Sequence, residues 1–156
     1  MDTSANTGSL LTHLAFVLGR QSDQALQEQL GIGMSQYKIL TMIAENPSVQ
    51  QRDIASSFGQ TEASISRQIK LLRKKELVTV RINPKNRRQH LSVLTIKGKH
   101  LTEAALAIFN RLYSEALSPL AAKQRDQLTE ALAQLHHHTC EPGKTAACDP
   151  LLQVWQ

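Results

Sequence analysis

The sequence predicts a mainly α-helical protein with one small β hairpin, and three observations lead to this prediction. Aromatic residues are only 4% of the 156-residue chain while hydrophobic residues are 41%. A core of leucine, isoleucine, valine and alanine is therefore expected, which suits packed helices better than a sheet sandwich. Apolar residues recur at helical spacing in most of the chain. They alternate only around residues 78–93, as the strands of a hairpin do.

The first helix is expected to run from Ser9 to about Leu30. It should end at Gly31, because glycine readily takes the left-handed conformation that closes helices. Its apolar residues form a broad stripe: Leu10, Leu11, Leu14, Val17, Leu18, Ala25 and Leu26. So broad a stripe indicates cover by more than one neighbour, with burial inside this chain alone as the alternative. Residues 1–8 are small and polar, and we expect them to be frayed.

Two shorter helices should follow. Ser35 can cap the first of them, which Asn46-Pro47 should end. Ser48 can cap the second, which Gly59 should end. The residues expected to be buried are Tyr37, Leu40, Ile43 and Ala44 in the first helix, and Ile54, Ala55 and Phe58 in the second.

A longer basic helix should begin after Thr61, whose hydroxyl can accept a free N–H of the first turn. Three residues at helical spacing form its apolar stripe: Ile65, Ile69 and Leu72. Its other faces are polar and cationic. This helix should therefore pack on one side and expose a positive surface on the other.

A β hairpin should follow the basic helix. Apolar and polar residues alternate on both sides of a turn at residues 83–86, where proline stands at the second position. The residues expected on its buried face are Val78, Val80 and Ile82 in the first strand, and Leu91 and Val93 in the second. The tip carries three basic residues: Lys85, Arg87 and Arg88.

Two further helices should complete the regular structure. Thr95 can cap the first, and Ser118-Pro119 can open the second, because proline is favoured at the first helical position. Their apolar residues recur at helical spacing: Leu101, Ala105, Ile108, Phe109 and Leu112 in one, and Leu128, Leu132 and Leu135 in the other, which continues to about His138. Together with the first helix they should form a second lobe.

Positive charge is concentrated in the middle of the chain. Residues 51–90 contain ten basic and three acidic residues, a net charge of +7, whereas the whole chain carries +5 and the remainder therefore −2. A localised positive field is what binding to DNA phosphates requires. The alternative is a solvated basic surface without a partner.

A helix, a proline corner, a short helix, a glycine turn, a longer helix and a hairpin with arginines at its tip are typical of a winged helix-turn-helix. Residues 9–138 resemble the MarR and SlyA family of transcriptional regulators, whose wing typically reads Asp-x-Arg and then, after a short strand, Leu-Thr. The matching residues are Asn86, Arg87 and Arg88, followed by Leu94 and Thr95.

Two residues depart from the family pattern. Asn86 replaces the usual aspartate, so the wing arginine lacks a carboxylate partner. Glu76 replaces the glycine that ends the recognition helix in left-handed geometry, which costs about 1 kcal/mol unless the helix ends differently. Neither departure removes a group that touches DNA.

The resemblance implies a sequence-specific DNA-binding regulator, and specifically a ligand-responsive homodimeric repressor of a pseudo-palindromic operator. Arg67 matches a family arginine that contacts the major groove, and a guanidinium bonded to guanine is also the commonest specific contact; an intramolecular salt bridge is the alternative. Arg88 matches the arginine that enters the minor groove. The predicted DNA-binding residues are Arg52, Thr61, Ala63, Ser64, Arg67, Gln68, Lys70, Arg73, Lys85, Arg87 and Arg88.

The chain is interpreted as one MarR-like domain over residues 1–156. Residues 34–95 form the DNA-binding lobe, 9–33 and 96–138 the dimerisation helices, and 139–156 a C-terminal tail. A homodimer is also expected from operator binding itself, because two recognition helices related by a two-fold axis reach adjacent major grooves about 34 Å apart.

A small molecule is the expected effector. Many family members hold a phenolic or anionic compound between the two lobes. Here His13, Phe16 and Arg20 of the first helix are candidates to line such a site, with core packing as the alternative for Phe16.

The end of the chain contains metal-ligand residue types close together. His136, His138, Cys140 and Cys148 allow a metal- or thiol-responsive regulator as an alternative. Their spacing matches no standard zinc pattern, so no metal is assigned. A winged-helix module that binds an acidic protein is a further alternative, which strong salt-dependent binding to a defined duplex would exclude.

Other classes of function find no support in the sequence. It has no Gly-rich phosphate loop, no nucleophile elbow and no His-Glu-x-x-His motif, so neither an enzyme nor a cofactor is expected. It has no apolar run of about 18 residues and no secretion signal. A cytoplasmic protein without a membrane partner is therefore expected.

Overall fold

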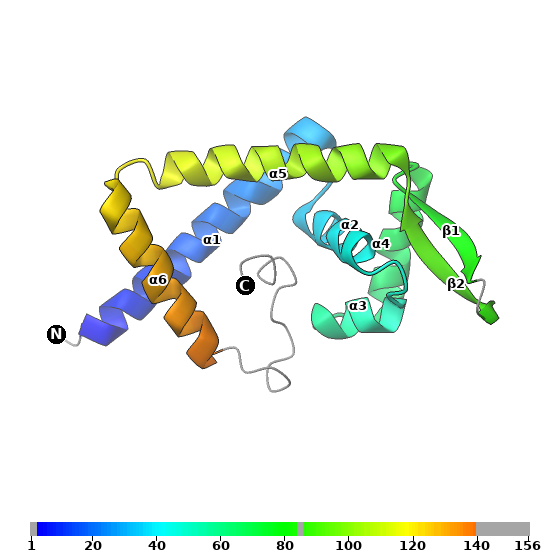
Figure 1. Cartoon of the computed structure of the whole chain (residues 1–156), viewed down its shortest axis with the longest axis horizontal. Helices are drawn as coiled ribbons and strands as arrows, with labels where there is room; N and C mark the ends of the chain where they lie inside the picture. Colours follow the sequence, from blue (N-terminus) through cyan, green and yellow to red (C-terminus); the bar gives the residue numbers. More distant parts are fainter. Residues whose placement is uncertain (1–2, 84–85, 140–156) are drawn as a thin grey trace.

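The computed structural model describes residues 3–83 and 86–139, with the side chains of residues 87–90 excepted. Its elements are α1 (Thr3–Leu30), α2 (Met34–Glu45), α3 (Gln51–Ser57), α4 (Glu62–Lys74), β1 (Val78–Asn83), β2 (Asn86–Leu94), α5 (Ile96–Ala116) and α6 (Ala122–Thr139). The long helix α5 joins two lobes: α2, α3, α4 and the hairpin lie at one end, and α1 and α6 extend at the other (Figure 1). Within this part of the chain, no helix has the length and apolarity that crossing a bilayer requires. The predicted fold, mainly α-helical with a small β wing, is confirmed.

The hydrophobic core lies in the winged lobe, which we define as α2 to β2. The ends of α1 and α5 close it, and its largest fully buried side chains include Leu26, Ile32, Ile39, Leu40, Ile43, Ile54, Ile65, Leu72 and Leu77. An aromatic row links α2 to α5: Phe109 meets Tyr37 edge to face with ring centroids 4.8 Å apart, and stacks on Tyr113 at 6.0 Å. The Tyr113 hydroxyl lies 3.3 Å from that of buried Ser22 in α1. Three helices are thus tied together where the lobes meet.

Helix α1 is longer than predicted. It begins at Thr3, so the expectation of a frayed segment is wrong for residues 3–8, and residues 1–2 lie outside the described residues. This segment has no proline, and the Thr7 hydroxyl finds its hydrogen-bond partner within the helix, at the Thr3 carbonyl 2.9 Å away. Of the predicted apolar stripe only Ala25 and Leu26 are buried. Burial inside this chain alone therefore does not account for the stripe.

Two predicted helix caps are confirmed. The Thr61 hydroxyl accepts the N–H of Ser64 at 3.2 Å, and the Thr95 hydroxyl accepts the N–H of Gly98 at 2.9 Å. In both helices a threonine oxygen replaces the carbonyl partner that the first turn lacks. Both helices begin where the sequence predicted.

The cap predicted at Ser35 is wrong. Helix α2 begins one residue earlier, after Gly33, and the Oδ1 atom of Asp23 accepts the N–H of Met34 at 2.7 Å. A carboxylate from α1 thus satisfies the first turn of α2, and its charge suits the positive end of the helix dipole. The predicted burial of Ala44 is also wrong, because this residue faces solvent at the end of α2.

The cap predicted at Ser48 is wrong as well. Helix α3 follows Gln50, which forms a capping box with Asp53: each side chain accepts the backbone N–H of the other residue. The Gln50 N–H donates to Asp53 Oδ2 at 3.2 Å. This reciprocal pair places the start of α3 later than a serine cap would.

Helix α6 begins later than the predicted Ser118-Pro119. The chain turns there, and the helix starts at Ala122. The side-chain oxygen of Gln124 accepts the N–H of Ala121 at 2.9 Å, which is one half of a capping box. A glutamine inside the helix therefore sets its start.

The hairpin projects from the winged lobe, and its burial departs from the predicted alternation. Among its described side chains, the buried ones lie at its base: Val78, Ser92 and Leu94. Ile82 is 61% exposed, and Val80, Leu91 and Val93 are only half-buried, so their predicted burial is wrong. Leu94 pairs with Val78, and Ser92 pairs with Val80, and directly opposite residues share a face. The core reaches only the first residues of this face.

The end of α4 and the start of α5 are in direct backbone contact. The Thr95 hydroxyl donates to the Glu76 carbonyl at 2.7 Å, and the Thr95 N–H donates to the Leu77 carbonyl at 3.1 Å. Gly98 lies so close that an added Cβ would be 2.1 Å from the Leu77 carbonyl oxygen. Only glycine fits there, and we call this contact the α4–α5 junction.

Gly98→Ala should lower the free energy of unfolding by about 3 kcal/mol, because the new methyl overlaps a backbone oxygen that moves only if α5 shifts. Gly19→Ala is the matched control, since it is also helical but an added Cβ meets nothing within 4 Å. The control should be stabilised by up to about 1 kcal/mol through helix propensity. Chemical denaturation measures both variants, and equal stabilities would show that α5 does not press on Leu77.

Candidate nucleic-acid interface

Helix α4 turns an apolar face to the core and a basic face to solvent. Ile65, Ile69 and Leu72 are buried, as predicted. The residues at the centre of the exposed side are Ala63, Arg67, Lys70 and Lys74. Leu71 beside them is 47% exposed, a feature that the apolar periodicity did not single out. The core holds α4 rigidly while its polar side remains open.

Arg67 is exposed on this helix. Its Nε donates to the Ala63 carbonyl at 3.3 Å, so the side chain lies back along α4. Within residues 3–83 and 86–139 it forms no ion pair. The guanidinium therefore keeps several N–H groups for an external partner.

Ser64 and Gln68 are half-buried and bonded to neighbouring side chains. The Ser64 hydroxyl donates to Gln60 Oε1 at 3.2 Å, and Gln68 Oε1 accepts from Gln36 Nε2 of α2 at 3.2 Å. Gln36 and Gln60 could not be predicted from the sequence, because their partners become neighbours only in the folded chain. Both bonds orient polar groups beside Arg67.

Two predicted residues stand near the start of α4. Arg52 is exposed on α3, with its Nε 3.7 Å from Asp53 Oδ1. An ion pair this exposed contributes little stability, so Arg52 can exchange it for another anion. The Thr61 hydroxyl is engaged as the N-cap of α4.

The wing carries the remaining predicted residues. Arg87 and Arg88 belong to β2, but their side chains lie outside the described residues, as does Lys85. Asn86 begins β2 and pairs with Asn83 across the turn. The hairpin extends beside α4 in Figure 1, so the backbone brings the wing and the recognition helix to the same lobe.

Glu76 ends the recognition helix in the left-handed conformation, with φ of 61°, and is the only non-glycine residue of the described chain with positive φ. The Leu77 N–H donates to the Leu72 carbonyl at 3.0 Å, and the Glu76 N–H to the Arg73 carbonyl at 2.9 Å. These two bonds form a Schellman motif. The departure from glycine therefore costs strain and does not change how the helix ends. Lys97 Nζ lies 3.6 Å from Glu76 Oε2.

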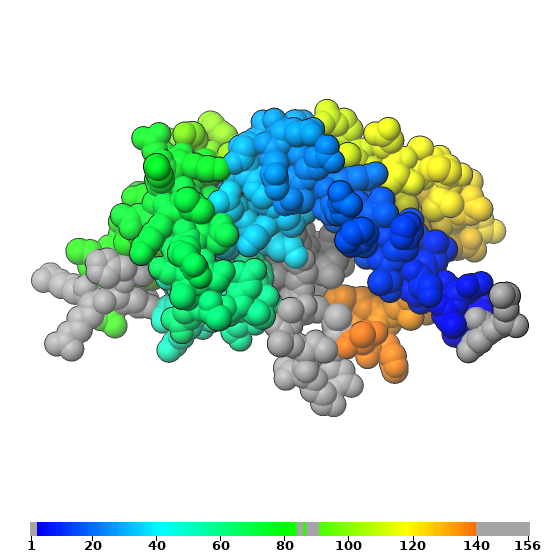
Figure 2. Space-filling model, turned by 180° about the vertical axis from the view of Figure 1, so that it is seen from behind, coloured from blue at the N-terminus to red at the C-terminus, as the bar shows by residue number. Residues whose placement is uncertain are grey.

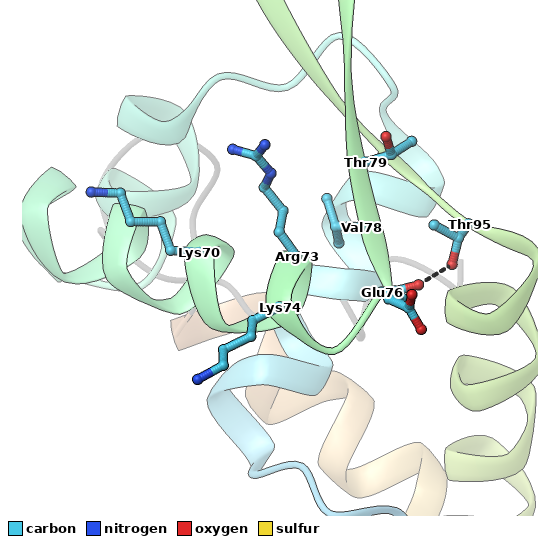
Figure 3. Close-up of a pocket in the computed structure, with 7 residues that line it drawn as sticks. All are labelled: Lys70, Arg73, Lys74, Glu76, Val78, Thr79 and Thr95. Atoms are coloured by element: carbon cyan, nitrogen blue, oxygen red, sulfur yellow. Dashed lines mark hydrogen bonds between the residues drawn. The ribbon is translucent and has the colours of Figure 1, made fainter.

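A hollow of about 500 Å³ opens between α4 and β1. It is lined by three cations of α4, which are Lys70, Arg73 and Lys74. The other lining residues are Glu76, Val78, Thr79 and Thr95. In Figure 3 the side chains of Arg73 and Lys74 extend from α4 in opposite directions, Lys70 extends away from β1, and the Thr95 hydroxyl is bonded to the Glu76 carbonyl. Lys70 and Arg73 were predicted to bind DNA, whereas Lys74 and Thr79 were not.

A second hollow, of about 480 Å³, lies along α1. Phe16, Arg20 and Asp23 line it, whereas His13 does not. Phe16 is 61% exposed, so its core packing is not observed in the single chain. The Arg20 guanidinium carbon lies 5.8 Å from the centroid of the Phe16 ring, a distance typical of a cation–π contact. Two of the three predicted ligand residues are thus brought together.

The candidate metal and redox residues are not brought together within the described chain. His136 and His138 lie in the last turn of α6, and no group of three or more suitable ligands occurs among residues 3–83 and 86–139. Cys140 and Cys148 lie outside the described residues.

Comparison with known protein families decides the relationship. Residues 32–90, from the start of the winged lobe into β2, match the model of the MarR family. This part of the chain is similar to the MarR family. The resemblance seen in the wing and recognition helix is therefore confirmed, together with its winged helix-turn-helix.

Two curated relatives support this assignment. The uncharacterized HTH-type transcriptional regulator YdgJ of Bacillus subtilis is 27% identical over 108 residues, which cover 69% of this chain and 66% of that protein. The HTH-type transcriptional regulator BilQ of Clostridium symbiosum is 26% identical over 105 residues, covering 67% of this chain and 73% of that one. Both are described as transcriptional regulators rather than enzymes.

Solved structures share the fold. MepR, a transcription regulator of the Staphylococcus aureus multidrug efflux pump MepA, matches with a TM-score of 0.72 at 23% identity, covering 82% of this chain and 94% of that one. CouR from Rhodococcus jostii RHA1, bound to p-coumaroyl-CoA, matches with a TM-score of 0.68 at 22% identity, covering 88% and 96%. At these identities the similarity shows the architecture.

Glu76→Gly should raise the free energy of unfolding of the protein by up to about 1 kcal/mol, because glycine takes positive φ without strain. Glu76→Ala keeps the strain and loses the carboxylate near Lys97, so it should not stabilise the protein. Thermal unfolding of both variants separates backbone strain from charge. A stabilised alanine variant would show that the side chain, and not the backbone, is unfavourable there.

Proposed function

We propose that this MarR-family DNA-binding transcriptional regulator is a homodimeric repressor, which binds a pseudo-palindromic operator and releases it when a small molecule binds. The observation that carries the proposal is the uncompensated basic side of α4. The exposed cations of α4 are Arg67, Lys70, Arg73 and Lys74. None of them forms an ion pair with another described residue. Exposed cations on a rigidly held helix are suited to DNA phosphates and base edges.

In this proposal Arg67 reads the major groove through a bidentate bond to guanine, and Ala63 touches a thymine methyl. The other contacts are assigned by position: Ser64 and Gln68 beside Arg67, Thr61 at the helix start, Lys85, Arg87 and Arg88 in the minor groove, and Arg52, Lys70 and Arg73 on phosphates. Occupation of the operator would block polymerase, which makes the protein a repressor.

The dimer is proposed to form through the helices within residues 9–33 and 96–138, with 34–95 as the DNA-binding lobe. Helix α6 has no buried residue in the single chain. Its three leucines are exposed, Leu128 by 36%, Leu132 by 41% and Leu135 by 49%. Figure 2 shows the first part of α1 at the end of the molecule opposite the hairpin, with α6 beside it. Exposed apolar surface of this kind marks an interface, and a second copy supplies the two-fold axis that a palindrome requires.

The proposed effector site is the hollow along α1, where an aromatic acid can place its ring on Phe16 and its carboxylate on Arg20. Structures similar to this chain contain p-coumaroyl-CoA or p-aminosalicylic acid. Asp23 lines the same hollow and caps α2, so the site lies next to the winged lobe. An effector that binds better to a dimer with wrongly spaced α4 helices would lower operator affinity by population shift.

Selection of bound duplexes from a randomised pool, followed by titration at several salt concentrations, tests operator binding. We expect an inverted repeat with half-sites about one helical turn apart and a steep loss of affinity with salt. On the selected duplex, Arg67→Ala should weaken binding by roughly 10- to 100-fold and relax base preference within each half-site.

Arg125→Ala is the control for this variant. It removes the same charge, and Arg125 also donates from Nε to a backbone carbonyl, that of Leu120 at 2.9 Å. This variant should bind like the parent. No enriched sequence in the selection would overturn the proposal, and parental behaviour of Arg67→Ala would overturn its groove assignment.

Leu132→Glu should convert the dimer to a monomer, because it places a charge in the proposed apolar interface. Loss of the second binding lobe should weaken operator binding by about 100-fold or more. Sedimentation measures the oligomeric state, and Gln134→Glu adds the same carboxylate at an exposed polar position of α6 as the control. A dimeric Leu132→Glu variant would show that α6 lies outside the interface.

A further inference from the structure

The C-terminal end of α4 is in contact with both helices that connect the winged lobe to the rest of the chain. These two helices are α1, which precedes the lobe, and α5, which follows it, and both run from the winged lobe to the other lobe (Figure 1). A residue at the end of α4 forms one hydrogen bond with the turn after α1 and another with the first turn of α5. The recognition helix is therefore joined at one point to both connecting helices.

Lys75, the C-cap residue of α4, forms the bond to α1. Its ammonium group donates to the carbonyl of Gly31, the residue that closes α1 with φ of 65°. This carbonyl lies at the negative end of the α1 dipole, where a cation is favoured. Lys75 thus differs from Arg73 and Lys74, which form no ion pair or side-chain hydrogen bond with another described residue.

Lys97, in the first turn of α5, forms the bond to α4. Its Nζ donates to the Lys75 carbonyl at 2.9 Å and lies 3.6 Å from Glu76 Oε2. The Lys75 carbonyl is one of the last of α4, which the helix itself leaves without a partner. Lys75 is therefore joined to α1 through its side chain and to α5 through its backbone.

These two bonds have a different effect from the core contacts of α4. Both lysines are exposed, whereas Leu72 and Leu77 at the same end of the helix are buried in the core. Apolar contacts have no preferred direction, so a packed helix can shift slightly against its neighbours. Hydrogen bonds require a defined distance and angle. The lysines therefore fix the exact position of an α4 end that the core already holds in place.

We propose that Lys75 and Lys97 are positioning residues, which set the distance between the two recognition helices of the dimer and hence the spacing of half-sites that the protein accepts. This inference rests on the proposed function. Each α4 is connected to the proposed interface through α1 and α5, and these are the helices that the two lysines join to it. Neither lysine is among the residues proposed to contact DNA.

A series of duplexes with altered spacing tests the inference. The operator selected above is compared with forms that have one base pair inserted or removed at its centre, which moves the half-sites by about 3.4 Å. The parent should bind each altered form about 100-fold more weakly, because only one half-site then fits. Lys75→Met/Lys97→Met should bind the selected operator about tenfold more weakly than the parent, because preorganisation is lost. It should lose only about a further tenfold on the altered forms, because α4 can follow the displaced half-site.

Two control variants separate positioning from charge. Lys75→Arg/Lys97→Arg keeps the charge and the N–H donors, so it should discriminate between spacings as the parent does. Lys99→Met/Lys123→Met removes equal charge from exposed positions on α5 and α6. It should also keep the discrimination, because a general loss of positive charge weakens binding to every duplex alike. Circular dichroism checks that all three variants are folded.

Equal discrimination in the parent and in Lys75→Met/Lys97→Met would overturn the inference and leave operator reading intact. Equal affinity of the parent for all spacings would overturn it too, since no distance would then be fixed. Reduced discrimination in Lys99→Met/Lys123→Met, to the same extent, would assign the effect to net charge and not to the two bonds. Failure of the parent to select any duplex would instead overturn the proposed function, and this inference with it.

Discussion

The α4–α5 junction is the contact on which the rest of the structure depends. Gly98 lies against the Leu77 carbonyl, and Thr95 bonds to the carbonyls of Glu76 and Leu77. This short segment contains the end of α4, the start of the hairpin and the start of α5. One set of backbone contacts therefore sets the direction of both proposed DNA-reading elements and of the helix that leads to the other lobe.

The two lobes reach stability in different ways. The winged lobe has its own core, in which α4 buries three aliphatic side chains and keeps its cations outside. A surface with many like charges is held in shape by apolar contacts that do not depend on salt. Helix α6 contributes nothing to that core, so its position depends on what its exposed leucines meet. Positive charge is thus concentrated on the winged lobe, which has its own core, and exposed apolar surface lies on α6, which has none.

Local signals in the sequence predicted the elements well and their boundaries less well. Thr61 and Thr95 were recognisable as caps because their partners lie three residues away. Asp23 was not, since it caps α2 from another helix, eleven residues earlier in the chain. The alternation of apolar and polar residues predicted the strands of the hairpin, but not how far the core extends along them. The core ends before Ile82, which is exposed.

The candidate site was predicted in part for a similar reason. The cations of α4 could be found from periodicity and charge, and the departure at Glu76 from the family resemblance. The opposite wall of the hollow could not, because Thr79 meets Lys70 and Arg73 only after β1 folds beside α4. No sequence pattern marks Gln36 and Gln60, because their role is to form hydrogen bonds with the side chains of Gln68 and Ser64 in the folded chain.

The length of α5 has a mechanical consequence. With 21 residues it is about 30 Å long, and its two ends belong to different lobes (Figure 1). The junction fixes one end to α4, and the edge-to-face contact of Phe109 with Tyr37 holds its second half on α2. The helix therefore acts as a rigid lever. A tilt of about 6° at its far end moves α4 by about 3 Å, close to the 3.4 Å rise of one base pair, so a small rearrangement between two copies is enough to put the recognition helices out of step with the DNA.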